Sequence, residues 1–252
     1  MSTVGKAASL LELFTMAEPE IGLSDLARRA GLDKATARRL LVALAAHRLI
    51  EQEPTNRRYR LGAGLSRLAR IRDANFPFAR IAMPVMRGLA EKTGETIHLS
   101  EFSAGALLTV HVELSARANR VNVNAGQILP LHGTASGLAF LAFSHSGTKE
   151  AYLDKPLERF TVHTMTDRSE LAEQVRLTAS RGYSRSAQGY EDGVHSVAAP
   201  ILGTDGHAIG ALSIASPLSR VDDTVAAAQG GAVMAAAREI AVRLTGEPLP
   251  PR

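Results

Sequence analysis

The 252-residue sequence contains no cysteine. It can therefore form neither a disulfide nor a thiolate-ligated metal site, which is compatible with a reducing compartment. No apolar run approaches the roughly 18 residues that a membrane-spanning helix needs. The apolar N-terminal segment is interrupted by Glu12, and no secretory cleavage pattern follows it, so we interpret it as a helix rather than a signal peptide. We expect a cytoplasmic protein with no membrane partner.

Motifs that would indicate an enzyme or a metal centre are also missing. The eight histidines include no HxxxH pair and no HExxH motif. His98, His111, His132 and His163 could meet after folding, but hydrogen-bonded core or surface positions are the simpler interpretation. In residues 133–137 the serine falls one place later than in the GxSxG nucleophile elbow. We therefore expect no metal, no cofactor and no catalytic activity.

Charge is distributed unevenly along the chain. Residues 1–72 carry 13 Lys and Arg against 7 Asp and Glu, whereas residues 73–252 carry 16 against 18. A length of 252 residues leaves room for one large domain, or for a small domain plus a medium one. A basic small domain on a nearly neutral large one is typical of a phosphate-binding head. The alternative is ordinary surface charge that happens to be unevenly spread.

Residues 23–46 predict two short helices joined by a tight turn. Ser24 is expected to be the N-cap of the first of them, and Asp33 the N-cap of the second. Gly31 supplies the left-handed conformation that a helix C-terminus needs, and the small side chain of Ala27 lets the two helices cross closely. This pattern predicts a helix-turn-helix.

The outward face of the second of these helices carries residues suited to reading DNA. Helical spacing predicts an inward stripe formed by Ala37, Leu40, Leu41 and Leu44. The opposite face and its flanks then present a small residue, a hydroxyl and two cations, namely Ala35, Thr36, Arg38 and Arg39. Such positions enter the major groove in helix-turn-helix proteins. A solvated cationic helix face is the alternative.

A β-hairpin is predicted directly after this helix. Residues 49–53 and 58–61 have strand character and flank a Pro/Asn turn. The turn and second strand contain Arg57, Arg58 and Arg60, so we interpret the hairpin as a wing that grips backbone phosphates. Phosphate contacts fix register without reading sequence. Arg57 and Arg58 are therefore expected to set the affinity for DNA. The two arginines of the preceding helix are expected to determine which base sequence is bound.

The remainder of the chain alternates helices and strands. A helix over residues 63–76 breaks near Pro77, and a further helix follows to about residue 93. The pattern then predicts strands at residues 96–102, 107–114, 121–123, 197–202 and 208–215, and helices at 134–143, 171–181 and 221–244. This mixture indicates an α+β sheet domain with helices packed on it.

The segment GLSDLARRAGLDKATARRLLVALAAHRLIEQEPTNRRYRLG resembles the DNA-binding head of the IclR family of transcriptional regulators. The resemblance includes Lys34-Ala35-Thr36 at the start of the recognition helix and Tyr59-Arg60-Leu61-Gly62 at the end of the wing. LHGTASGLAFLAF and EDGVHSVAAPILGTDGHAIGALSIASP are similar to the family's effector domain. The resemblance covers essentially the whole chain. It implies a largely helical winged helix-turn-helix over residues 1–62, a linker helix over 63–76 and a GAF-like α/β effector domain over 77–252.

The resemblance also implies where a small organic acid would bind. In the family the effector lies between the sheet and a helix start, whose backbone N–H groups receive it. Many members carry an acid at the position of Ser186 and a cysteine at that of Ser196. Gln188 together with Ser196 is similar to the branch that senses aromatic acids such as protocatechuate or 4-hydroxybenzoate. The implied contacts are Ala135, Ser136, Ser186, Gln188, Ser196, Ser213 and Ala215.

We therefore expect a repressor or activator that binds a double-stranded operator as a homodimer or a dimer of dimers, because one head spans only a half-site. The residues expected at the DNA are Ser24, Lys34, Ala35, Thr36, Arg38, Arg39, Arg57, Arg58 and Arg60. Two alternatives remain open. The basic head could bind RNA or a protein, or the second domain could act on its small molecule as an enzyme.

Overall fold

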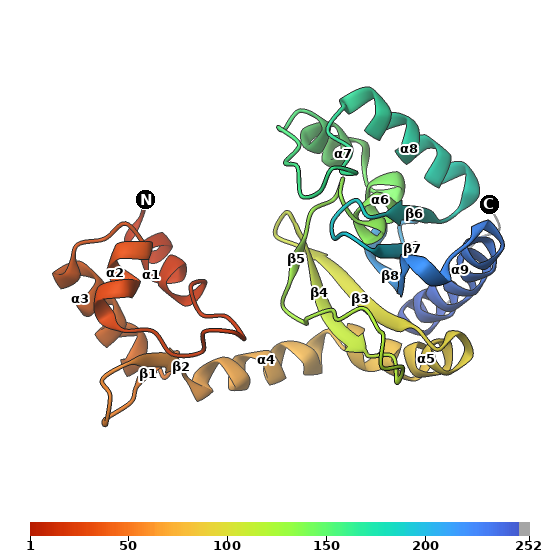
Figure 1. The fold of residues 1–252 in the computed structure, drawn as a ribbon. Coiled ribbons are helices and arrows are strands. Elements are labelled where there is room, and N and C mark those ends of the chain that lie inside the picture. Colours follow the sequence, from red (N-terminus) through yellow and green to blue (C-terminus); the bar gives the residue numbers. More distant parts are fainter. Residues whose placement is uncertain (247–252) are drawn as a thin grey trace. The chain divides into compact units, whose positions relative to one another are not determined.

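The computed structural model describes residues 1–246 and divides the chain into two compact units, Met1–Pro77 and Phe78–Arg252 (Figure 1). The last six residues of the expected effector domain, 247–252, lie outside the described residues. Within residues 1–246 no helix is long and apolar enough to cross a membrane. The predicted α+β class, with a largely helical head and a sheet domain, is confirmed.

The first unit is a three-helix core with a hairpin and a following helix. Its elements are α1 (Thr3–Leu11), α2 (Leu23–Arg29), α3 (Lys34–Ala46), β1 (Ile50–Gln52), β2 (Tyr59–Leu61) and α4 (Ala63–Asn75). β1 and β2 pair antiparallel, as predicted for the wing. The inward stripe of α3 is buried against Leu26, Ile50 and Tyr59. The hairpin is thus anchored on its inner face, while its turn is left exposed.

The helix caps of this unit follow the prediction at α3 but not at α2. The Asp33 side chain accepts a hydrogen bond from the Thr36 N–H, and Gly31 has a φ of 64°, as expected. The N-cap assignment of Ser24 is wrong, because α2 starts two residues earlier, at Leu23, with Gly22 as its N-cap. The cause is a bridge between Ile21 and Tyr59, whose backbone hydrogen bonds keep the chain extended up to the helix start.

The second unit is built on a six-stranded antiparallel sheet of order β5-β4-β3-β8-β7-β6. Its strands are β3 (Thr96–Ser103), β4 (Ala106–Glu113), β5 (Ile128–Leu129), β6 (Ser184–Ala187), β7 (Val194–Leu202) and β8 (Ala208–Pro217). Its helices are α5 (Phe78–Thr93), α6 (Ala135–Phe143), α7 (Ser146–Leu153), α8 (Arg168–Arg181), a short 3-10 turn and α9 (Asp223–Thr245).

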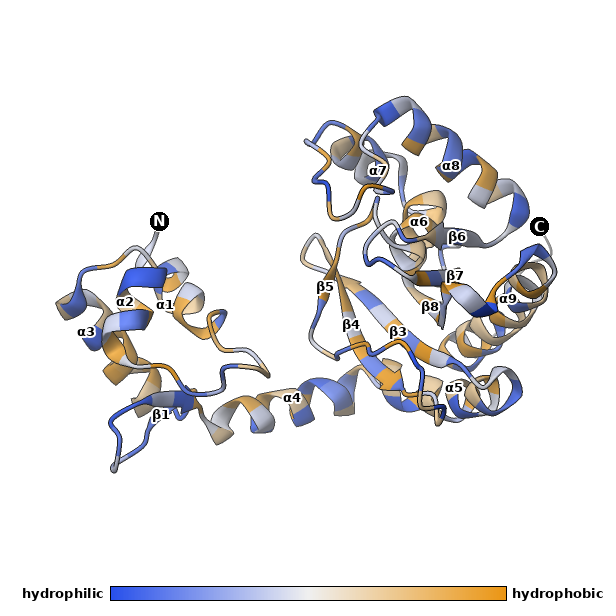
Figure 2. Ribbon diagram, in the orientation of Figure 1, coloured by the Kyte–Doolittle hydropathy of each residue, from blue (hydrophilic) through white to orange (hydrophobic). Residues whose placement is uncertain are grey.

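The two faces of the sheet are covered differently. Large apolar side chains such as Leu99, Leu212 and Ile214 pack with α5 and α9 on one face. On the other face α6 packs through small residues that include Ala139 and Ala211. Every residue of α6 is buried, in agreement with its apolar colouring in Figure 2. One face therefore provides a packed core, and the other leaves room beside small side chains.

The sequence prediction of this unit needs three corrections. The strand expected at 121–123 does not form; the ladder partner of β4 is β5 instead. The carbonyl of Val121 accepts a hydrogen bond from the Thr96 side chain, so this segment is held without a strand ladder. The short elements α7 and β6 were not expected. The other predicted helices and strands form, with ends shifted by a few residues.

Candidate nucleic-acid interface and ligand cavity

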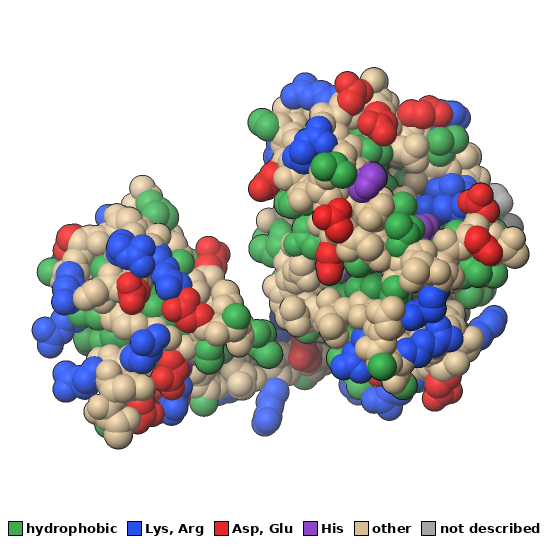
Figure 3. All heavy atoms as spheres, viewed as in Figure 1, with side chains coloured by type: hydrophobic (Ala, Val, Ile, Leu, Met, Phe, Trp, Pro, Cys, Tyr) green, Lys and Arg blue, Asp and Glu red, His purple; other side chains and the backbone are tan. Residues whose placement is uncertain are grey.

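A groove on the first unit lies between α3 and the wing. Among the predicted contacts it brings together Ser24, Lys34, Arg38, Arg57 and Arg58. All five are exposed, and Lys and Arg side chains are prominent on the face of this unit seen in Figure 3. Helix and hairpin thus present cations to one concave surface, as a duplex with its phosphates requires.

The exposed face of α3 continues this surface. Ala35 and Arg39 lie beside Arg38 in a second shallow hollow, together with the apolar side chains of Leu23 and Val42. Val42 is 60% exposed although it is apolar. Cations beside exposed methyl groups suit the edges of bases, because thymine presents a methyl group in the major groove. Thr36 is half-buried, and its N–H is occupied by the Asp33 cap.

The basic residues of α3 and the wing differ in the hydrogen bonds and ion pairs that they make within the protein. Within the described residues, the side chains of Lys34, Arg38, Arg39 and Arg57 make no ion pair or hydrogen bond. The Arg58 guanidinium donates to the carbonyl of Glu20, at 2.5 Å from Nη2, which fixes the wing to the segment before α2. The cations without internal partners are free to neutralise phosphates.

Arg60 is placed differently from the other predicted contacts. It lies on the outer face of β2, where its guanidinium is 3.3 Å from the carboxylates of both Glu51 and Glu53. It does not line the groove between α3 and the wing. The structure therefore does not bring Arg60 together with Arg57 and Arg58.

In the second unit a cavity opens between the sheet and the N-terminus of α6. Strand register sets its floor: Ser186 pairs with Ser196, and Ser196 with Ala215. In the next row Ser213 pairs with His98. All five line the cavity. The cavity is partly open to solvent, and its volume for water-sized molecules is about 60 Å³.

The wall opposite the floor is the first turn of α6. Thr134 caps the helix by accepting the Gly137 N–H, while the N–H groups of Ala135 and Ser136 have no acceptor within the described residues. A Cβ on Gly137 would lie 2.3 Å from the Leu131 Cα, so glycine is needed for this loop to approach the helix. Free donors at the positive end of a helix favour an anion.

His98 connects floor and wall, and its place in the cavity was not foreseen from the sequence. Its Nε2 lies 3.2 Å from the Ser136 hydroxyl, and its Nδ1 has no hydrogen-bond partner within the described residues. Burial lowers the pKa of His98 to about 4, so the ring is neutral at pH 7. A buried polar atom without a partner is costly.

Two further predicted serines line the cavity, whereas Gln188 does not. The hydroxyl of Ser186 donates to the Gly133 carbonyl, and that of Ser213 donates to the Val197 carbonyl. Gln188 does not line the cavity: it has a φ of 58° and its side chain accepts the Gly193 N–H in a turn.

Two residues that no sequence pattern indicated lie on the cavity lining. Gln127 donates to the Tyr190 hydroxyl at 2.8 Å, which joins two loops across the cavity. No Lys or Arg side chain is among the described residues of this lining. An anionic ligand would therefore depend on backbone donors, hydroxyls and the helix dipole for its recognition.

Both regions match known proteins. Residues 3–54 match the family described as the IclR helix-turn-helix domain, and residues 74–242 match "Bacterial transcriptional regulator IclR C-terminal". The glycerol operon regulatory protein of Streptomyces griseus is 32% identical over 222 residues, which is 88% of this chain and 87% of that protein.

Solved structures agree. A crystal structure of an IclR-type transcriptional regulator from Silicibacter sp. TM1040 superposes with a TM-score of 0.89 at 38% identity, covering 99% of this chain and 98% of that one. An IclR homologue from Microbacterium hydrocarbonoxydans, complexed with 4-hydroxybenzoate, superposes with a TM-score of 0.84 at 25% identity over 98% and 100% of the chains. The proteins matched are transcriptional regulators rather than enzymes.

Proposed function

This chain belongs to the IclR family of bacterial DNA-binding transcriptional regulators. We propose that three consecutive parts of it have separate functions. Residues 1–62 are the operator-binding head, 63–76 the linker helix and 77–252 the effector-binding domain. In this proposal the protein acts in the cytoplasm on the bacterial chromosome. The free cations in the groove between α3 and the wing carry the assignment of the head to duplex DNA.

In the proposed complex α3 lies in the major groove, where Arg38 and Arg39 contact base edges beside Ala35. Arg57 and Arg58 of the wing contact phosphates, with Ser24 and Lys34 at the backbone nearby. Arg60 is not included among the phosphate contacts, since two carboxylates already neutralise it. In this proposal α3 reads the base sequence, and the wing binds the DNA backbone.

Salt dependence of operator binding tests this assignment. We expect Arg57→Ala to weaken binding to all duplexes and to reduce the slope of log affinity against log salt by about 0.9, the value for one lost phosphate contact. Fluorescence anisotropy between about 50 and 200 mM salt measures both effects. Arg60→Ala is the matched control on the same hairpin, with an unchanged slope expected.

The assignment would be overturned if Arg57→Ala left the salt slope unchanged. Tighter binding to single-stranded RNA than to duplex DNA of the same sequence would instead support the alternative of an RNA-binding head.

We propose a small organic acid as the effector, with its carboxylate at the N–H groups of Ala135 and Ser136. His98 and Ser196 would contact the other end of the molecule. The free donors of the α6 first turn support this orientation. The relative from M. hydrocarbonoxydans is complexed with 4-hydroxybenzoate, which makes single-ring aromatic acids the first compounds to examine.

We further propose a homodimer, or a dimer of such dimers, as the operator-binding form. α4 carries the half-exposed apolar residues Leu68 and Ile71 one turn apart, with Leu65 partly buried before them. An apolar stripe on an exposed helix suits a second copy of the same helix. Sedimentation of the free protein checks the proposal, and a monomer at micromolar concentration would contradict it.

A further inference from the structure

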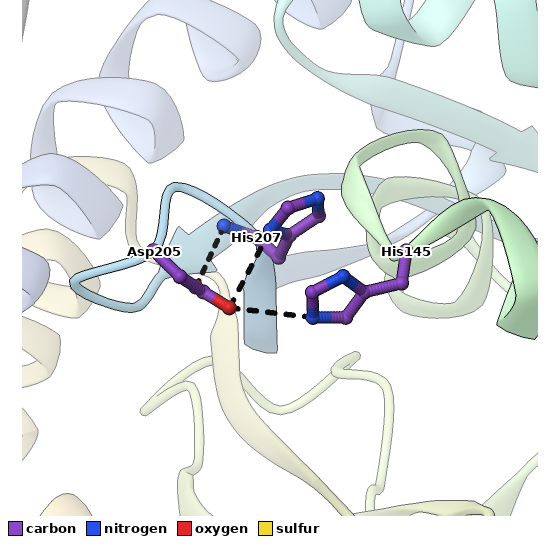
Figure 4. Close-up of side chains that lie close together, drawn as sticks. All are labelled: His145, Asp205 and His207. Carbon is purple, nitrogen blue, oxygen red and sulfur yellow. Dashed lines mark hydrogen bonds and ion pairs between the residues drawn. The ribbon is translucent and has the colours of Figure 1, made fainter.

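Two imidazoles and a carboxylate meet on the surface of the second unit, and none of them lines the ligand cavity. His145 is the N-cap residue of α7, two residues after the end of α6. Asp205 and His207 lie in the turn between β7 and β8. Figure 4 shows the carboxylate of Asp205 directed toward both rings. The fold thus joins residues that lie 60 positions apart in the sequence.

The donor atoms have the spacing of a metal site. The Asp205 Oδ2 lies 3.3 Å from the His145 Nε2 and 3.4 Å from the His207 Nδ1, and all three atoms lie within 4.8 Å of one another. A tetrahedral ion with bonds of about 2.0–2.2 Å needs ligand atoms roughly 3.3–3.6 Å apart. Two of the three separations already satisfy this requirement.

The backbone holds the carboxylate of Asp205 in place, because its Oδ1 accepts the His207 N–H at 3.0 Å. Its Oδ2 faces the two rings and contacts both of them. The His207 Nδ1 is shielded from solvent, and its partner is the Asp205 Oδ2 at 3.4 Å. A metal ion would replace this ion-pair contact.

One rearrangement is required. The two rings are stacked, with centroids 3.6 Å apart and planes 19° apart. A metal ion lies in the plane of each imidazole that binds it, so a single ion cannot serve both rings while they are parallel. The His145 side chain is 63% exposed and follows the end of a helix, so its ring can turn toward the ion.

We propose that His145, Asp205 and His207 form a binding site for one divalent transition-metal ion, with zinc as the preferred ion and water as the fourth ligand. Two imidazoles and one carboxylate select zinc, cobalt or nickel rather than magnesium or calcium. The bound ion ties the turn between β7 and β8 to the C-terminal end of α6. The opposite end of α6 forms the wall of the ligand cavity.

Cobalt titration of the full-length, metal-stripped protein tests the site. We expect one Co²⁺ per chain, visible absorption bands of a four-coordinate complex, and their loss when Zn²⁺ is added. His207→Ala and His145→Ala should each weaken binding at least tenfold, comparable with the loss on removing other metal-site partners. His163→Ala is the matched control, because His163 is an exposed loop histidine outside the cluster.

Equal Co²⁺ affinity in the wild type and in the double variant His145→Ala/His207→Ala would overturn the proposal, as would Mg²⁺ binding as tightly as Zn²⁺. Circular dichroism of each variant verifies folding. A folding defect in one of the two single variants leaves the other as the test. Zn²⁺ should also raise the thermal unfolding temperature of the wild type and of His163→Ala, but not of the double variant. None of these outcomes depends on operator or effector binding.

Discussion

At the scale of single residues, position in the fold gives the same side chain different chemistry. His98 is buried between β3 and α6, and burial alone lowers its pKa to about 4. His145 and His207 lie at the surface beside a carboxylate. The first ring is a neutral hydrogen-bonding group at pH 7, whereas the other two contact the carboxylate of Asp205 at 3.3 and 3.4 Å. Nothing in the sequence around these residues distinguishes the two cases.

The pKa of His98 makes the stability of the protein depend on pH. Because the folded pKa is lowered below the ordinary value of about 6.5, the unfolded chain binds more protons between pH 6.5 and 4, and acid therefore favours unfolding. We expect this group to remove about 2 kcal/mol of the free energy of unfolding between pH 7 and pH 5. Urea unfolding at the two pH values measures the loss.

The variant His98→Gln isolates this effect, because glutamine does not titrate and can still reach the Ser136 hydroxyl. Its free energy of unfolding should fall by about 2 kcal/mol less than that of the wild type between the same pH values. His195, whose pKa is also lowered by burial, is present in both proteins. A variant with the wild-type pH dependence would show that His98 is not the titrating group.

At the scale of helices and strands, short-range patterns predicted most of what local physics controls. The Asp33 cap and the apolar stripe of α3 could be predicted because both depend on neighbours within a few residues. The start of α2 could not, since a bridge from Ile21 to Tyr59 sets it. The strand β6 was missed because its four residues carry two serines and an arginine, and only pairing with β7 makes them a strand.

The residues of the cavity could likewise be predicted only in part, because some of its contacts depend on distant parts of the chain. Residues such as Ala135, Ser196 and Ser213, expected from the family resemblance, do line it. Gln188 does not, because its backbone conformation turns the side chain toward Gly193. The contact of His98 with α6 needed the register of a sheet that the sequence does not specify.

Two adjacent glycines in α9 offer a matched test of its packing. A Cβ on Gly230 would lie 2.4 Å from the ring of Tyr183, whereas nothing lies within 4 Å of one on Gly231. We expect Gly230→Ala to destabilise the unit by about 1–3 kcal/mol through overpacking. Gly231→Ala should stabilise it by about 0.5–1 kcal/mol, because alanine restricts the unfolded chain and favours a helix.

Thermal and urea unfolding of the two variants provide the comparison. If Gly230→Ala were as stable as Gly231→Ala, the ring of Tyr183 would not be packed against α9 as described.

At the scale of the whole molecule, a regulator must connect effector occupancy with operator affinity. Couplings between sites are typically about 1–3 kcal/mol, which corresponds to roughly 5–150-fold in affinity. We expect an effector such as 4-hydroxybenzoate to change operator affinity within this range. Thermodynamic linkage then requires the operator to change effector affinity by the same factor. Titration of each ligand with and without the other measures both factors.

The uncharged analogue 4-hydroxybenzamide is the control for this experiment, because it keeps the ring but lacks the charge that the α6 N-terminus would receive. A screen of aromatic and aliphatic acids that gave no thermal shift would contradict an acid effector. Equal responses to acid and amide would show that the helix terminus does not recognise the ligand's charge.

The alternation along β7 and β8 has a consequence for how this regulator can diverge. Ser196 and Ser213 face the cavity, while their neighbours Val197 and Leu212 belong to the packed core on the opposite side. Adjacent codons therefore come under separate selective pressures. Exchanges at every second position can alter which metabolite is sensed, while the intervening positions preserve the scaffold, so new specificities can arise without passing through unfolded intermediates.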